Sequence, residues 1–188
     1  MLIKFAVKNF HGFAERIEWD LSHPSNYSFN TYAVKDGVIK NGIIYGPNGS
    51  GKSNFALAIF DIEYHLSVKW KKADYLSNYV YIGNPNSPVE FEYVFKFGND
   101  ILEYRYSKNA SGMLIAESLV ANNKQVFKRE NDVFEIDDDQ FRIDATVKEN
   151  FKQNVNSVSV INFLTASFPF PQDHYIVKLV LFVNTMLW

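Results

Sequence analysis

The sequence contains no cysteine, which excludes a disulfide-stapled scaffold and any metal site built on thiolates. Its four histidines are scattered and show none of the spacings of a histidine metal site. Basic residues are not in excess either. The 19 basic and 21 acidic residues leave a formal net charge of −2, so no overall positive field indicates a nucleic-acid-binding protein.

Long hydrophobic runs are missing as well. The most apolar segment, Ile176 to Val183, contains Lys178 and is far shorter than the roughly 20 residues that span a bilayer. Residues 1–8 carry lysines at positions 4 and 8 and lack the uninterrupted apolar core of a signal peptide. From these absences we expect a cytoplasmic protein without a membrane segment.

Apolar and aromatic side chains are abundant. They make up 47% and 16% of the residues, which excludes general disorder. A chain of 188 residues is long enough for one domain with a sizeable core, or for part of a larger one.

One stretch is far more specific than the rest of the chain. Residues 46–53 match the phosphate-loop pattern G-x-x-x-x-G-K-S, whose glycines let backbone N–H groups turn toward one anion, such as a triphosphate. Lys52 is expected to reach the β- and γ-phosphates, and Ser53 to supply a hydroxyl ligand to Mg²⁺. The predicted ATP-binding residues are Gly46, Pro47, Asn48, Gly49, Ser50, Gly51, Lys52, Ser53 and Asn54, and Lys52 is also the predicted catalytic residue.

The flanks of this loop fit the pattern. Gly42 to Tyr45 is a short apolar run typical of a buried strand, and Asn54 to Leu66 is helical in composition and free of proline and glycine. Strand, loop and helix in this order would aim the positive end of the helix dipole at a phosphate. The alternative interpretation is a glycine-rich turn with a purely structural role.

The N-terminal region predicts two short strands, Leu2 to Val7 and Ile17 to Leu21, with a tight turn over Asn9 to Phe13. If both strands join the sheet of the phosphate loop, the turn places His11 beside that loop. The alternative is that His11 is a solvated turn residue.

The helix after the loop is apolar nearly all round, so we expect it to lie buried between two layers. Its polar residues Asp61, Glu63 and His65 would then mark the end that emerges into solvent. The basic cluster at residues 69–72 is interpreted as a solvated helix end. The alternative is that it binds a phosphate backbone.

From Pro88 the hydrophobic period changes to two, and turn residues separate short strands up to Ile136. This pattern predicts an antiparallel meander of about five strands. Its face with Phe91, Tyr93 and Phe95 is expected to pack on the sheet that carries the predicted strand at residues 42–45.

The acidic run at residues 137–139 lacks the spacing of a calcium loop and is read as a solvated turn, with a metal site as the alternative. Residues 150–188 are apolar and largely helical in pattern. The chain stops inside this pattern without a cap or a polar tail, so we expect a fragment or a truncated product.

The Asn9 to Phe13 turn, the GPNGSGKSN loop and the strands from Phe91 to Arg129 resemble the N-terminal half of an ABC-type ATPase of the RecF and SMC class. More closely, the chain looks like the bacterial AAA family ATPases related to OLD-type proteins. The resemblance implies an α/β P-loop NTPase fold, with an ABC-ATPase-like mixed sheet around a buried helix and an antiparallel β-meander. Residues 1–188 would form part of one domain, with the phosphate-loop core at 1–70, the meander at 88–136 and the start of a helical region at 150–188.

The resemblance also implies ATP and Mg²⁺ as ligands and a homodimer in the full-length protein. It adds His11 to the predicted ATP-binding residues, since the family has an arginine or lysine there that reaches the nucleotide. The sequence has no LSGGQ-like signature and no apolar run that ends in Asp-Glu, so whether this chain hydrolyses ATP is left open. The weak candidates for the family's Q-loop glutamine are Gln153 and Gln172.

Many members of this family belong to anti-phage systems, and the predicted function is therefore an ATP-binding module that controls an effector, such as a nuclease or a toxin. Two alternatives stay open. One is a DNA-repair or chromosome-maintenance ATPase that acts on duplex DNA, and the other is a non-catalytic nucleotide-binding assembly module.

Overall fold

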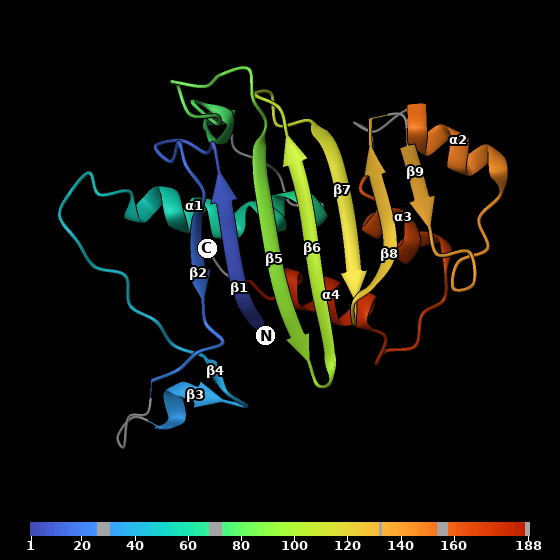
Figure 1. Cartoon of the computed structure of the whole chain (residues 1–188), viewed down its shortest axis with the longest axis horizontal. Helices are drawn as coiled ribbons and strands as arrows, with labels where there is room; N and C mark the ends of the chain where they lie inside the picture. The colour runs from blue at the N-terminus through green and yellow to red at the C-terminus, as the bar shows by residue number, and fades with distance from the viewer. Residues whose placement is uncertain (26–30, 68–72, 132, 154–157, 187–188) are drawn as a thin grey trace.

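The computed structural model describes residues 1–25, 31–67, 73–131, 133–153 and 158–186, so the basic cluster at 69–72 lies outside the described residues. Seven strands form one sheet in which every neighbouring pair is antiparallel (Figure 1). Their order is β2 (Ile17–Asp20), β1 (Leu2–Lys8), β5 (Val89–Phe97), β6 (Asp100–Lys108), β7 (Leu114–Ala121), β8 (Lys124–Glu130) and β9 (Val133–Ile136). A separate ribbon pairs β3 (Val34–Lys35) with β4 (Val38–Ile39).

The meander from β5 to β9 follows from its alternating side chains. The register places Phe91 opposite Tyr106 and Tyr93 opposite Tyr104, so aromatic rings gather on one face of the sheet. The turn between β7 and β8 is made by two asparagines, Asn122 and Asn123, with φ of 51° and 64°. A two-residue hairpin needs this left-handed backbone, and asparagine tolerates it. The five strands expected between residues 88 and 136 are therefore present.

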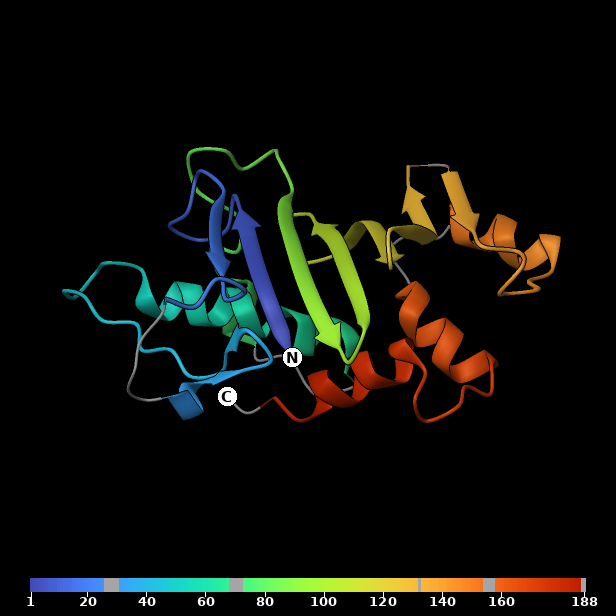
Figure 2. The ribbon, with the colours of Figure 1, turned by 60° about the horizontal axis from the view of Figure 1, so that its bottom comes forward.

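Helices cover one face of this sheet. The helices α1 (Lys52–Leu66), α3 (Val160–Ser167) and α4 (Tyr175–Asn184) lie on the same side, and α2 (Ala145–Gln153) lies beside β9 (Figures 1 and 2). Two short 3₁₀ turns, η1 (Thr31–Ala33) and η2 (Ala73–Leu76), lie in the connections. The buried core joins the aromatic face of the meander to apolar residues of the helices, among them Ile62, Leu66, Leu164, Leu179 and Val183.

The predicted fold class, a P-loop NTPase with a mixed sheet, is wrong: the observed sheet is antiparallel throughout the described residues. Residues 42–45, expected to be a strand, belong to no strand. The short turns from β5 to β9 place each strand antiparallel to the one before it, whereas a parallel pair needs a long crossover connection. Both edges of β1 are already occupied by β2 and β5. Because β2 and β9 end the strand order at opposite edges, the sheet is not a closed barrel either.

Two packing predictions that depended on this fold class are also wrong. The aromatic face of the meander packs on helices rather than on a second sheet, as shown by the edge-on contact of Phe95 with Phe182 of α4 at 5.4 Å between ring centroids. Helix α1 lies against one sheet and is not enclosed between two layers (Figure 2). One layer of helices is enough here because only one face of the antiparallel sheet is apolar.

Two of the three polar residues expected to emerge at the end of α1 are buried instead, and the third, His65, is half-buried. Asp61 and Glu63 are 0% and 5% exposed. Asp61 forms an ion pair with Lys108 of β6 and accepts hydrogen bonds of 2.6 to 2.8 Å from the hydroxyls of Tyr75, Tyr79 and Tyr106. Burial alone raises the pKa of Asp61, but the Lys108 ammonium and these hydrogen bonds outweigh it and hold the pKa below its usual value. This carboxylate therefore anchors α1 to the sheet.

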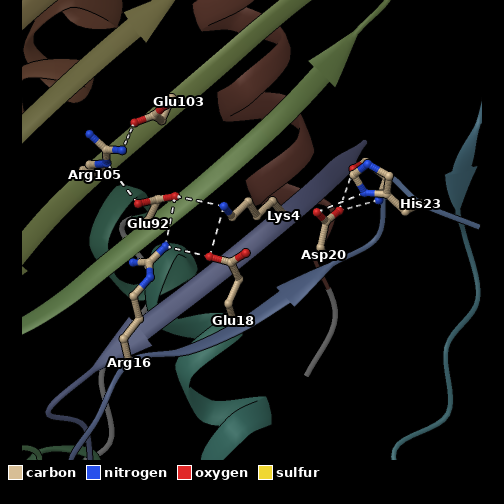
Figure 3. A network of polar contacts seen from close by, with 9 residues as sticks. Lys4, Arg16, Glu18, Asp20, His23, Glu92, Glu103 and Arg105 are labelled. Carbon is tan, nitrogen blue, oxygen red and sulfur yellow. Dashed lines mark hydrogen bonds and ion pairs between the residues drawn. The ribbon is translucent and has the colours of Figure 1, made fainter.

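The face of the sheet opposite the helices carries paired charges (Figure 3). Arg16 lies 3.0 Å from Glu18 and 3.2 Å from Glu92. Glu92 also forms an ion pair with Arg105 at 3.0 Å. Lys4 lies 3.0 Å from Glu18. Each of these cations faces a carboxylate, so the positive charge of this network is balanced locally. Separately, no helix among the described residues combines the length and the apolar character needed to cross a bilayer.

Candidate phosphate-binding site

The loop of residues 46–51 leads directly into α1. Gly49 and Gly51 have φ of 80° and 91°, a left-handed backbone that disfavours side chains. The first N–H group to bond in the helix is that of Phe55, which donates to the Gly51 carbonyl at 2.8 Å. The N–H groups of residues 52–54 therefore have no acceptor within the helix and lie at its positive end.

Lys52 reaches back across the loop. Its Nζ donates to the carbonyl oxygens of Gly46 and Pro47, both at 2.8 Å. These acceptors are neutral, so the positive charge is not compensated by them. An ammonium group has three N–H donors, and the third remains for a further acceptor.

The loop borders a hollow of about 280 Å³, which we name the loop hollow. Seven consecutive residues line it: Asn48, Gly49, Ser50, Gly51, Lys52, Ser53 and Asn54. Ser53 is exposed at the first turn of the helix. Together with the two carbonyls that hold Lys52, every residue of the predicted motif thus borders this hollow or contacts the lysine.

The turn between β1 and β2 lies against the loop. Phe10 and Phe13 exchange backbone hydrogen bonds of 3.0 and 2.8 Å, which close this turn. A Cβ added to Gly12 would lie 3.3 Å from Nδ2 of Asn54, so the turn contacts the start of α1. The two segments are neighbours as the sequence suggested, although β1 and β2 belong to the antiparallel sheet and not to a sheet that contains the loop.

The ring of His11 packs on aromatic neighbours. Its centroid lies 4.3 Å from that of Phe10 and 6.5 Å from that of Tyr79, and its backbone N–H donates to the Tyr79 carbonyl at 3.1 Å. The ring Nε2 is buried without a hydrogen-bond partner in the described part of the chain. Burial lowers the pKa of His11, against a smaller opposing effect of the Asp61 charge, so the ring is neutral at pH 7. The contacts described for this side chain thus do not include the loop.

A second hollow, of about 460 Å³, adjoins the loop and was not predicted; we name it the aromatic hollow. It is lined by Glu18, by loop residues Gly46, Pro47, Ser50, Gly51 and Lys52, and by the apolar side chains of Phe13, Ile17, Trp19, Ile44, Tyr45 and Phe55. The apolar residues come from three separate segments and share no spacing. No sequence pattern could therefore have grouped them.

The acidic run after β9 takes part in ion pairs. Asp137 lies 2.6 Å from Lys124, and Asp138 pairs with Lys148. Residues 137 and 138 directly follow β9 at one edge of the sheet, whereas the loop of residues 46–51 lies beyond the opposite edge (Figure 1). Within the described ranges, no group of three or more histidine, aspartate and glutamate residues is arranged to hold a metal ion.

Comparison with known protein families finds no family whose pattern this sequence matches, and a search of curated proteins finds no relative. The resemblance to ABC-type ATPases therefore stays a prediction. Any functional assignment depends on the geometry of the loop and its two hollows.

Proposed function

We propose that this chain binds the phosphates of a nucleoside triphosphate, with ATP and Mg²⁺ as the ligand, at residues 46–54. The junction of the loop with α1 carries the proposal. The N–H groups of residues 52–54, which have no acceptor within the helix, and the Lys52 ammonium border one small hollow there. Hydrogen-bond donors and a positive charge around a concave surface are what a phosphate group requires.

Each residue has a distinct role in this proposal. Lys52 donates its remaining N–H to a phosphate oxygen, and the backbone N–H groups of Ser53 and Asn54 bind the same anion. The exposed Ser53 hydroxyl suits Mg²⁺, which prefers oxygen ligands and keeps several waters. The magnesium ion would neutralise phosphate charge, with phosphate oxygens and water as its other ligands. We assign no ligand contact to His11, because its ring packs on Phe10 and Tyr79.

The proposal concerns binding rather than turnover. Hydrolysis also needs a group that positions the attacking water. The acidic residues Asp137 and Asp138 are held in ion pairs at the β9 edge, and the loop lies beyond the opposite edge of the sheet (Figure 1). Effector control, dimer formation and a cytoplasmic location remain predictions from the sequence.

Duplex DNA as a direct partner gains no specific support. Binding to a phosphate backbone requires cations that release counterions, whereas Lys4, Arg16 and Arg105 on the open sheet face are each paired with a carboxylate (Figure 3). A nucleotide, with its few phosphates, fits the small loop hollow better than a long polyanion does.

Isothermal titration calorimetry with ATP and Mg²⁺ tests the proposal. We expect Lys52→Ala to weaken binding about 10- to 100-fold, because a charge-assisted contact contributes roughly 1.5–3 kcal/mol. Lys40→Ala, at an exposed lysine outside the loop, is the matched control and should bind like the parent. Circular dichroism should show the same folded spectrum for all three proteins. Equal affinity of Lys52→Ala and the parent would exclude the loop as the phosphate site.

A further inference from the structure

The aromatic hollow has no role in the phosphate contacts described above. We propose that it binds the base of the nucleotide and does so by stacking, so that the site accepts adenine and guanine nucleotides alike. This inference rests on the proposed function, since the phosphates must first be held by the loop.

The two hollows border the same part of the loop. Ser50, Gly51 and Lys52 line both of them, and the volumes are about 280 Å³ for the loop hollow and about 460 Å³ for the aromatic hollow. The loop hollow is bordered by hydrogen-bond donors and a positive charge, whereas the aromatic hollow is mostly apolar. A ligand that combines an anionic chain with a planar ring, as a nucleoside triphosphate does, matches both sides at once.

The aromatic residues differ in how firmly they are held. Trp19 is fixed by an edge-on contact with Phe55, with ring centroids 5.5 Å apart, and its ring lies against Gly42, where an added Cβ would be 2.9 Å from Cζ2. Tyr45, by contrast, is 90% exposed. An exposed aromatic ring beside a rigid apolar wall is a ready stacking surface, because each base has a π face.

Few side chains of the aromatic hollow could form hydrogen bonds with the edge of a base. Glu18 is the acidic residue of the hollow, and its carboxylate already binds Lys4 and Arg16, both at 3.0 Å, on the open face of the sheet (Figure 3). The remaining side chains away from the loop are aromatic or aliphatic. Stacking alone discriminates weakly between bases, whereas strong discrimination requires hydrogen bonds to the base edge.

Calorimetry with three probes, ATP, GTP and inorganic tripolyphosphate, each with Mg²⁺, tests this inference. We expect the parent to bind ATP and GTP within about 3-fold of each other and both more tightly than tripolyphosphate. Tyr45→Ala should weaken ATP and GTP by about 5- to 100-fold and leave tripolyphosphate unchanged, because base stacking on an aromatic residue contributes in this range. Tyr45→Phe, which keeps the ring, should bind like the parent. Tyr32→Ala, at a tyrosine 71% exposed in η1, is the matched control and should change nothing.

Three results would overturn the inference while the proposed phosphate site stands, provided that Lys52→Ala still weakens tripolyphosphate binding about 10- to 100-fold. They are equal affinity for ATP and tripolyphosphate, equal loss of all three ligands in Tyr45→Ala, and a preference of more than about 100-fold for one base. If the parent binds none of the three probes, both the inference and the proposed function are wrong. Since Tyr45 is exposed, its replacement should leave the fold intact, which circular dichroism checks.

Discussion

The ring of Phe13 lies so close to Gly51 that a Cβ added to this glycine would be 2.9 Å from Cε1 of the ring. Phe13 belongs to the turn after β1, and Gly51 is the last residue before α1. Because Gly51 also has φ of 91°, both its backbone and its surroundings exclude a side chain. The shape of the proposed phosphate loop therefore depends on a residue from the antiparallel sheet region.

Replacing this glycine should damage the loop specifically. We expect Gly51→Ala to lower the free energy of unfolding by about 1–2 kcal/mol from backbone strain and to weaken ATP binding, because Phe13 and the loop must move apart. Gly98→Ala is the control, since Gly98 has φ of 67° and no atom within 4 Å of an added Cβ. It should show a comparable loss of stability in urea titrations but bind ATP normally. Normal ATP affinity in Gly51→Ala would contradict the proposed loop geometry.

The buried ion pair between Asp61 and Lys108 should be essential for stability. We expect Asp61→Asn to lower the free energy of unfolding at pH 7 by about 3–5 kcal/mol, because it leaves the buried Lys108 ammonium without this carboxylate. The double variant Asp61→Asn with Lys108→Met should recover part of the loss, since it removes both charges. Urea titration measures all of these values, and Asp36→Asn, at an exposed aspartate, should match the parent.

The same ion pair predicts how the stability difference between the parent and Asp61→Asn depends on pH. The pKa of Asp61 is lower in the folded than in the unfolded chain, so in acid the unfolded chain takes up its proton first. Its contribution is therefore complete above the unfolded pKa of about 3.9 and disappears as the pH falls through the folded value. The stability gap between parent and Asp61→Asn should be constant near neutral pH and shrink below about pH 4. A gap that grows in acid would show that the pKa of Asp61 is raised instead.

The apolar face of the meander should not tolerate charge. Phe95 is 1% exposed and packs on Phe182 of α4, so Phe95→Asp places an unpaired carboxylate in the core and should unfold the domain. Ile101→Asp on β6 is the control, because Ile101 is 39% exposed. Thermal melts should show a cooperative transition for the control and none for Phe95→Asp. A stable Phe95→Asp protein would contradict the packing of this face on α4.

The 188-residue chain should bind ATP without hydrolysing it at a useful rate. Lys52 and Mg²⁺ compensate phosphate charge, but neither positions the attacking water. Steady-state phosphate release from the purified chain, with Lys52→Ala as the background control, measures this directly. Sustained phosphate release that depends on Lys52 would show that an acidic residue of the chain positions the attacking water. Glu18, which shares the aromatic hollow with Lys52, would then be tested first as Glu18→Gln, ahead of the distant Asp137 and Asp138.

Local features of this protein were determined by the sequence itself. The alternation after Pro88 predicts the meander, whose last strand, β9, ends at Ile136 as expected. The helix expected from Asn54 to Leu66 is present as α1, which begins two residues earlier at Lys52 and ends at Leu66. These predictions succeed because side-chain period, turn asparagines and glycine backbone freedom act over a few neighbouring residues.

Only the tertiary structure decided how these elements combine. Asp61 was expected at a solvated helix end, yet it is buried and pairs with Lys108, which is 47 residues away in the sequence. A local hydrophobic pattern cannot predict such a contact. The segment at residues 42–45 has the composition of a strand but belongs to no strand, and the two neighbours of β1 are β2 and β5 instead. The aromatic hollow gathers residues from three segments. Burial, strand pairing and pocket lining all depend on contacts between distant residues, and the short-range pattern of a sequence leaves those contacts undetermined.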